Sequence, residues 1–440
     1  MSQPYESRDP VHGFVTFSGW ERDIINHDVF QRLRRIRQLA WTEMVYPGAV
    51  HTRFEHSLGV MHTATRMFRQ LADNSARLLG DLGISKDTGL DRDLQMVRLA
   101  ALLHDVGHSP FSHAGEDLMP LDPAAGKPYK HEQYSAALIR TLLRDVIDDH
   151  PGNQSFDIRA DDVADLIEGN TRLKQRRLFW RQLITSQLDA DRADYLLRDS
   201  HHLGVNYGRY DLERVIVTLT AVRDPDTEDP ILAIQEGGWH AAEALVWARY
   251  QMFTQVYFHK TRVAYDHHVA RTMAHILAAT PVGQGGSPDG RFPPPTDAGS
   301  LRRYLGWTDW RVLGLLEGGA GGEHGEILRR RKHYRQVYET PEVPDEGDVD
   351  TLERIIEALG DRLLHIGRPE TSWYKDVGEI QIAQSSGEEP ATKPLSSFSR
   401  PIRLLGKLNR QYLYVAEEHA HEARATVKQI VSGTRAGGDA

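Results

Sequence analysis

The stretch Ala100-Ala-Leu-Leu-His-Asp-Val-Gly-His-Ser-Pro-Phe-Ser-His113 decides the fold of this chain. Its apolar first half predicts a buried helix over 91–103, and the helix delivers a His-Asp pair. His104 and His108 are four residues apart, about one helical turn, so both are expected on one helix face. Pro110 disfavours a helix that continues through it. Imidazoles and carboxylates are costly to bury unpaired, so the pattern favours a metal site.

A structural role is the alternative at this point. Isolated His-Asp dipeptides usually have no function, and histidines one turn apart are often hydrogen-bonded core residues or surface residues. This stretch alone is equally compatible with both interpretations.

Composition excludes several classes of protein. The 440 residues suffice for one large core and a smaller second unit. A net charge of −9 argues against general nucleic-acid binding, although a local basic pocket for phosphates remains compatible with it. The chain has no cysteine, so any metal ion must be held by nitrogen and oxygen. With a polar N-terminus and no apolar run of about 18 residues, the chain is expected to be cytoplasmic, with no membrane contact.

Apolar residues at three- and four-residue steps predict a mainly α protein. The expected helices cover residues 21–39, a segment ending at 71, 91–103, 132–147, 161–168, 178–186, 188–198, 212–222 and 239–277. Short strands are expected at 14–17 and 231–234.

The chain is expected to divide into four parts. A helical core spans 1–280, and a flexible Gly/Pro-rich insertion spans 281–300. A helical extension covers 301–368. A small α+β region covers 369–440, with strands at 379–383 and 412–416, a helix over 417–431 and a disordered tail from 433.

A second informative stretch lies at 187–199. Asp191, Tyr195 and Asp199 fall at i, i+4 and i+8, so they form one polar stripe on a predicted helix. Spacing alone favours a solvated face with ion pairs to Arg192 and Arg198.

Four candidates together form a plausible ligand set: His56, His104, Asp105 and Asp191. Two imidazoles and two carboxylates suit a divalent Fe, Mn, Zn, Co or Mg ion and leave coordination positions open. Helical proteins build metal sites in this way, from side chains on separate helices.

The order His … His-Asp … Asp resembles the HD-domain deoxynucleoside triphosphate (dNTP) triphosphohydrolases, the branch that includes the SAM-and-HD-domain protein of vertebrates and the bacterial dGTPases. Eight ordered motifs over about residues 9–260 carry the resemblance. They are Asp9-Pro-Val-His-Gly, Phe30-Gln-Arg-Leu-Arg, Gln38-Leu, Arg53-Phe-Glu-His-Ser-Leu-Gly-Val, Leu103-His-Asp-Val-Gly-His-Ser-Pro-Phe-Ser-His, Lys130-His-Glu-Gln, Asp189-Ala-Asp-Arg-Ala-Asp-Tyr-Leu-Leu-Arg-Asp and Tyr257-Phe-His-Lys.

The resemblance implies an HD-domain helical core, to which the small C-terminal α+β region predicted above is appended. It implies hydrolysis of a dNTP to deoxynucleoside and inorganic triphosphate, with the four candidates as metal ligands and a second Mg ion beside the triphosphate. His113 matches the general-acid position and is oriented by Glu116, a residue one methylene longer than the usual Asp. His108 and His131 are its catalytic neighbours.

The resemblance also implies a substrate-binding set. Arg53, Arg192 and Arg249 match phosphate-contacting positions. Gln38 and Asp199 match positions that contact the sugar 3′-hydroxyl. The remaining members, Leu39, Tyr195 and Tyr257, would pack against the deoxyribose and exclude a 2′-hydroxyl.

Relatives of this kind assemble as homo-oligomers, so a tetramer or hexamer and a nucleotide effector are expected. Gln31 and Arg34 of the effector region are kept, but Asn26 stands where an acidic residue is usual and Tyr5 where a basic one is. Activation by GTP or dGTP in its usual form is therefore not expected. Nucleic acid is a less favoured partner.

Two other functions fit the same motifs. An HD phosphohydrolase could act on another nucleotide, a phosphomonoester or a single-stranded nucleic-acid end. A non-catalytic nucleotide sensor or nucleic-acid binder could also retain the scaffold, but the complete ligand set argues against it.

Overall fold

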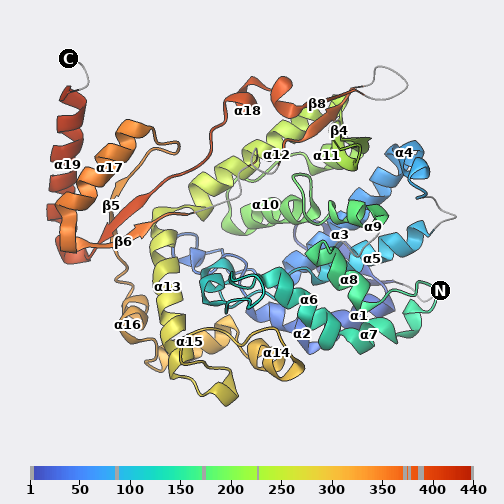
Figure 1. Ribbon diagram of the computed structural model, residues 1–440, viewed down its shortest axis with the longest axis horizontal. Coiled ribbons are helices and arrows are strands. Elements are labelled where there is room, and N and C mark those ends of the chain that lie inside the picture. Colours follow the sequence, from blue (N-terminus) through green and yellow to red (C-terminus); the bar gives the residue numbers. More distant parts are fainter. Residues whose placement is uncertain are drawn as a thin grey trace.

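A computed structural model describes residues 4–84, 89–170, 175–224, 227–369, 374, 378–384 and 391–437. Helices dominate this part of the chain, and the described strands form three small sheets (Figure 1). The prediction of a mainly α fold is confirmed. Within the described residues, no helix is long and apolar enough to cross a membrane.

The chain begins with an antiparallel hairpin of β1 (Tyr5–Asp9) and β2 (Gly13–Phe17). The strand expected at 14–17 is therefore present. Gly13 closes the turn with φ 78°, a left-handed conformation that glycine adopts without strain.

The single helix expected over 21–39 is wrong. The structure has α1 (Gly19–Asn26), α2 (Asp28–Gln31) and a 3-10 turn at Arg32–Arg35. His27 ends α1 with an extended backbone, and its side chain accepts a hydrogen bond from Val29 N, so that a new helix begins there. Tertiary contacts thus override the continuous apolar period.

Three helices form the centre of the molecule. The long α3 (Arg53–Asn74) packs against both α5 (Leu90–Leu103) and α10 (Ala190–Leu203). Around them lie α4 (Ala76–Asp81), α6 (His131–Thr141), α7 (Arg144–Asp148), α8 (Ala160–Glu168) and α9 (Gln175–Arg181). The helix expected over 132–147 is therefore two helices.

α5 ends at Leu103, several residues before Pro110, the residue through which no helix was expected to continue. Residues 104–107 form turns, so His104 and His108 do not share a helix face, contrary to the prediction. The consequence is that the two histidines belong to different clusters, described below.

The next segment contains α11 (Leu212–Thr218), β3 (Leu219–Arg223), β4 (Pro230–Gln235), α12 (Trp239–Met252) and α13 (Lys260–Ala279). The expected helix over 212–222 stops early because its last residues pair with β4. The expected helix over 239–277 is interrupted by a π-helical turn at Phe253–Tyr257.

The segment 281–300, expected to be a flexible insertion, lies against the core. Phe292 is buried and its N–H donates to Leu118 O at 3.0 Å, while Tyr134 Oη donates to Pro293 O at 2.7 Å. α14 (Ala298–Leu305), α15 (Asp309–Glu317) and α16 (Gly322–Arg330) follow.

A separate α+β unit closes the chain. Its sheet has the order β5-β9-β6, and its helices α17 and α19 share a core with that sheet. The elements are β5 (Arg335–Glu339), α17 (Glu346–Leu359), β6 (Leu363–Gly367), β9 (Tyr412–Val415) and α19 (Ala420–Gly437).

The unit thus begins at β5, well before residue 369, which is the start predicted from the sequence. β7 (Gln381–Ala383) and β8 (Thr392–Pro394) instead extend the β3–β4 sheet, and α18 (Arg400–Leu404) follows them. α19 continues to Gly437, past the expected start of the disordered tail at residue 433, and residues 438–440 lie outside the described residues.

Candidate metal centre and adjoining cavity

His56 lies in the first turn of α3, where Glu55 caps the helix by accepting a hydrogen bond from Thr52 N. Its imidazole is buried, and Nδ1 donates to Asp194 Oδ2 at 2.8 Å. That hydrogen bond fixes a proton on Nδ1, so Nε2 is the nitrogen left to bind a cation, and it makes no hydrogen bond within the described residues.

His104 reaches the same place from the end of α5. Its Nδ1 donates to Ala101 O at 2.8 Å, and its buried Nε2 also makes no hydrogen bond. Buried polar atoms without partners are rare in folded proteins. Two such lone pairs on neighbouring imidazoles fit a bound cation.

Two carboxylates complete the set. Asp191 Oδ1 lies 3.0 Å from His56 Nε2 and 3.8 Å from His104 Nε2. Asp105 Oδ1 lies 3.3 Å from His104 Nε2, and Asp105 Oδ2 lies 3.7 Å from His56 Nε2. Donors bound at about 2.1 Å to one octahedral ion are roughly 3.0 Å apart when adjacent, so these spacings fit a divalent cation.

Charges favour a cation at this position. Burial lowers the pKa of His56, but Asp191 and Asp194 outweigh burial and raise it to about 10. The two carboxylates thus favour a positive charge at Nε2, which is a proton in the metal-free chain and would be replaced by a bound cation. Burial raises the pKa of Asp105, but Arg53 and the neighbouring histidines hold it well below its ordinary value. Arg53 Nη1 pairs with Asp105, and its Nε donates to Ser112 Oγ at 2.8 Å.

Asp105 also belongs to a second group of potential ligands, with His108 and His131. His108 Nε2 lies 3.3 Å from Asp105 Oδ1, and its ring stacks on His131 at 3.8 Å. Burial and the charge of Arg53 hold the pKa of His108 well below its ordinary value, so this imidazole is neutral.

Glu116 joins the expected catalytic histidines. Its Oε2 accepts from His113 Nδ1 at 3.0 Å and its Oε1 from His131 Nδ1 at 2.7 Å. The additional methylene of Glu116, compared with Asp, still allows both contacts. The His113 side chain is 63% exposed, so its Nε2 is accessible to a ligand.

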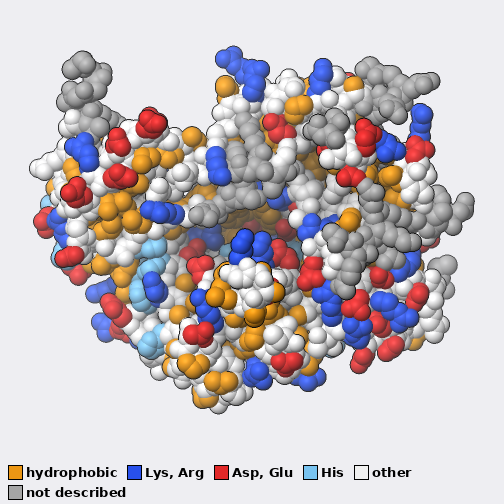
Figure 2. Space-filling model, viewed as in Figure 1, with side chains coloured by type: hydrophobic (Ala, Val, Ile, Leu, Met, Phe, Trp, Pro, Cys, Tyr) orange, Lys and Arg blue, Asp and Glu red, His pale blue; other side chains and the backbone are white. Residues whose placement is uncertain are grey.

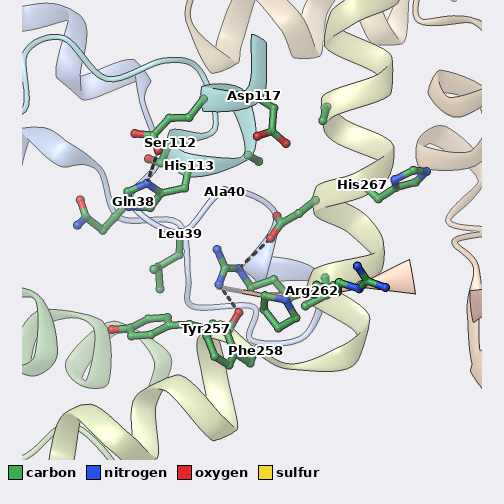
Figure 3. A pocket seen from close by; sticks show the side chains of 18 of the residues that line it. Gln38, Leu39, Ala40, Ser112, His113, Asp117, Tyr257, Phe258, Arg262 and His267 are labelled. Atoms are coloured by element: carbon green, nitrogen blue, oxygen red, sulfur yellow. Dashed lines mark hydrogen bonds and ion pairs between the residues drawn. The ribbon is translucent and has the colours of Figure 1, made fainter. Parts of the chain in front are cut away.

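Next to these groups lies a cavity of about 890 Å³ (Figure 3). Its wall includes most of the expected substrate-binding set, namely Gln38, Leu39, Arg53, Tyr195, Asp199 and Tyr257. His113 and Glu116 also line it. Residues from five separate parts of the chain are thus gathered around one cavity.

Asp199 is held from two sides. His51 Nε2 donates to Asp199 Oδ1 at 2.8 Å, and Tyr257 Oη donates to Oδ2 at 2.6 Å. His51 has no functional signal in the sequence, because only the fold brings α10 beside the residues that precede α3.

Arg192 and Arg249 do not line this cavity. Arg192 Nη1 pairs with Asp189 Oδ2 at 2.7 Å, and Arg249 Nη1 donates to Gln187 Oε1 at 3.0 Å. Burial lowers the pKa of Arg249, and the nearby Arg192 charge lowers it further. Their expected contact with phosphate is therefore not visible in this conformation.

Histidine side chains gather over α13 on the face seen in Figure 2. A second hollow of about 470 Å³ lies there, lined in part by His267, His275 and His324. His267 and Arg271 also line the larger cavity, so the two hollows share a wall.

The profile of the HD domain matches residues 53–199. This is an HD-domain protein. The match begins at the first residue of α3 and ends on α10, so it encloses all four predicted ligands.

Relatives with assigned names support this family. The uncharacterized protein YwfO of Bacillus subtilis is 36% identical over 268 residues, which cover 59% of this chain and 53% of that protein. The SAMHD1 homolog of Dictyostelium discoideum, named a deoxynucleoside triphosphate triphosphohydrolase, is 33% identical over 258 residues, covering 57% of this chain and 45% of that protein. This HD-domain chain thus matches about half the length of these relatives.

The fold is that of HD phosphohydrolases. A phosphohydrolase from Bacteroides thetaiotaomicron superimposes with a TM-score of 0.70 at 25% identity, covering 94% of this chain and all of that one. The predicted HD domain is thereby confirmed, and the chain is similar to proteins named dNTP triphosphohydrolases.

Proposed function

We propose that this HD-domain protein hydrolyses dNTPs to deoxynucleoside and inorganic triphosphate with a divalent cation held by His56, His104, Asp105 and Asp191. The observation that carries the proposal is the pair of buried imidazoles whose unpaired Nε2 atoms face two carboxylates. The site adjoins a cavity with polar groups suited to a sugar.

A bound Fe, Mn, Zn, Co or Mg ion would supply Lewis acidity at the attacked phosphate, and a second Mg ion would offset the charge of the triphosphate. The group Asp105, His108 and His131 is the nearest described set that could hold such a second ion.

The leaving 5′-oxygen needs a proton, and His113 is our candidate donor. Glu116 holds its Nδ1–H, which leaves Nε2 directed to a ligand. Burial lowers the pKa of His131, but Glu132 and Glu116 raise it to about 9. Without a second ion in its group, His131 is therefore protonated on both nitrogens at neutral pH, beside this pair.

Substrate contacts follow from the cavity wall. Arg53 would bind phosphate, and Arg192 and Arg249 would join it after side-chain movement. Gln38 and Asp199 would contact the 3′-hydroxyl, and Leu39, Tyr195 and Tyr257 would leave no room for a 2′-hydroxyl. We further propose a cytoplasmic homo-oligomer, a tetramer or hexamer, in which a nucleotide effector would bind without the usual acidic contact at Asn26.

The test is product analysis. Metal-loaded protein is incubated with each dNTP, each NTP and a short oligonucleotide in Mn²⁺ and Mg²⁺, with and without GTP and dATP. Tripolyphosphate plus deoxynucleoside is the expected product. Orthophosphate or nucleoside monophosphate would instead indicate an HD phosphohydrolase with another substrate.

The variants His104→Ala and Asp105→Ala are expected to lose both turnover and bound metal. Full turnover in either variant would exclude the proposed site. Asp165→Asn, on α8, is the matched control, because it removes a charge paired with Arg140 away from the centre.

A further inference from the structure

The turn between β1 and β2 has no role in the proposed function, although it carries the motif Asp9-Pro-Val-His-Gly. Asp9 Oδ1 accepts hydrogen bonds from Val11 N at 2.9 Å and His12 N at 2.8 Å. These bonds fix the turn and direct His12 inward, where its side chain is only 3% exposed.

His12 reaches the metal centre through one carboxylate. Its Nε2 donates to Asp194 Oδ1 at 2.6 Å, and Asp194 Oδ2 accepts from His56 Nδ1 at 2.8 Å. Asp194 is fully buried. An unbroken series of hydrogen bonds therefore leads from the N-terminal turn to a predicted metal ligand.

Arg198 fixes this carboxylate from a third side. Its Nε donates to Asp194 Oδ2 at 2.8 Å and its Nη2 to Oδ1 at 2.9 Å. Its Nη1 donates to Asp9 Oδ2 at 2.8 Å, so one guanidinium connects α10 to the turn. With contacts from two histidines and one arginine, Asp194 cannot rotate independently of the turn.

Stability alone does not explain the arrangement, since apolar side chains can often replace buried ionic groups without loss of folding stability. The orientation that these contacts give to the His56 ring does explain the arrangement. A histidine that donates Nδ1–H to a carboxylate is fixed in one tautomer and orientation, and its Nε2 becomes a better ligand.

We propose that His12 and Asp194 are positioning residues of the metal centre, which hold His56 so that its unprotonated Nε2 faces the cation. The turn at residues 9–13 is on this basis a part of that centre. The inference rests on the cation-binding part of the proposed function and not on the choice of substrate.

Cobalt(II) is the probe for the test. The metal-free full chain is titrated with Co²⁺ against a chelator, and the paramagnetic NMR spectrum is recorded in water. Wild-type protein is expected to show two exchangeable, strongly shifted N–H signals, one from His56 Nδ1 and one from His104 Nδ1. Because His104 donates to Ala101 O, its signal is an internal reference.

Asp194→Asn is expected to weaken Co²⁺ binding about 10- to 100-fold and to move or remove one N–H signal while the other stays. His12→Ala should cause a smaller change of the same kind. His12→Gln, which keeps an N–H donor, should restore part of the affinity. Asp165→Asn should change neither the affinity nor the signals.

Wild-type affinity and both signals in His12→Ala would overturn the inference. This variant leaves Asp194 bound to Arg198, so it decides the question even if Asp194→Asn does not fold. A wild-type chain that binds no Co²⁺ would overturn the metal centre together with the inference. Unchanged variants of a Co²⁺-binding chain would overturn the inference alone.

Discussion

At Gly59 the backbone of α3 lies so close to α10 that an added Cβ would be 1.9 Å from Asp194 Oδ1 and 2.3 Å from Arg198 Nη2. Both atoms are fixed by hydrogen bonds, so neither can retreat without loss of a contact. Glycine is thus required here for close packing and not for an unusual φ angle.

We therefore expect Gly59→Ala to lower the free energy of unfolding by about 1–3 kcal/mol through overpacking. It should also weaken metal binding, since Asp194 must shift. The control is Gly314→Ala, at an exposed position of α15 with no atom within 4 Å, which should raise stability by about 0.5–1 kcal/mol. Chemical denaturation of both variants checks this, and equal stability of the two would contradict it.

Glu116 accepts one histidine hydrogen bond at each carboxylate oxygen, and in Glu116→Gln one of these two acceptors becomes an NH2 donor. If His113 is the proton donor, Glu116→Gln should reduce kcat about 10²- to 10⁴-fold. The ion held by His56, His104, Asp105 and Asp191 should stay bound, since Glu116 contacts none of these four residues. Steady-state rates with metal analysis on the same samples measure both quantities; a wild-type kcat would remove Glu116 from the mechanism.

For individual residues, the sequence predicted which side chains form the candidate metal centre but not which hydrogen bonds orient them. His56, His104, Asp105 and Asp191 were predicted as one set; the structure groups the donor atoms of His56, His104 and Asp191, and places Asp105 between this group and His108. His12 and Asp194 lie in two of the quoted motifs, but nothing in either motif indicated their contact, which joins positions 182 residues apart. Hydrogen bonds of that separation have no local pattern.

Among the elements, α14 and α15 fix the loop that carries His108 and His113. Tyr304 Oη, on α14, donates to Gly107 O at 2.7 Å. Asp309, on α15, accepts from Arg37 N and Phe111 N, both at 2.8 Å. Phe111 and Ser112 have φ of 55° and 54°, a strained conformation that these contacts maintain.

Asp309 gives the loop a pH dependence. Burial raises its pKa from 3.8 to about 6, against the opposing effect of the two backbone hydrogen bonds. The protonated carboxyl therefore stabilises the folded state, fully below pH 3.8, and this stability is lost as the pH rises through about 6.

Between pH 5 and pH 7.5, wild-type protein should lose about 1 kcal/mol more unfolding free energy than Asp309→Asn does. Denaturant titrations of both proteins at the two pH values give this difference directly. Parallel pH dependence in the two proteins would show that Asp309 does not titrate in this range.

Several helix boundaries could not be predicted because distant residues determine them. The apolar period of 239–277 is continuous, yet the π-helical turn at Phe253–Tyr257 breaks it. Beyond the turn, Tyr412 Oη donates to Phe258 O and Tyr414 Oη to Lys260 O, both at 2.7 Å. These partners lie 154 residues further along the chain.

For the whole molecule, the helical class and the central helices α3, α5 and α10 followed from periodicity and motif order. The small C-terminal α+β unit was also predicted, with a strand at 412–416 and a helix after it, but its strand pairing was not. Its central strand β9 pairs with both β5 and β6. In the sequence, however, β9 is separated from β6 by a long segment that contains β7 and β8 of the other sheet. Short strands carry too little local information to reveal such pairing.

A cation bound between α3, α10 and the end of α5 should stabilise the whole fold, because the unfolded chain lacks the site. At an ion concentration about 100 times Kd, the gain is about 2.7 kcal/mol. Thermal melts with Mn²⁺ and after chelation should differ accordingly. His104→Ala should melt at the same temperature in both conditions, and a metal-dependent shift in that variant would point to a different site.

The contact between His12 and Asp194 also has a consequence for synthesis on the ribosome. The turn emerges first, yet its partner follows 182 residues later. At about 5–20 residues per second, the hairpin waits roughly 10–40 s before α10 arrives. A nascent chain therefore cannot take up the ion early, and it becomes competent for the metal only once α10 has been translated.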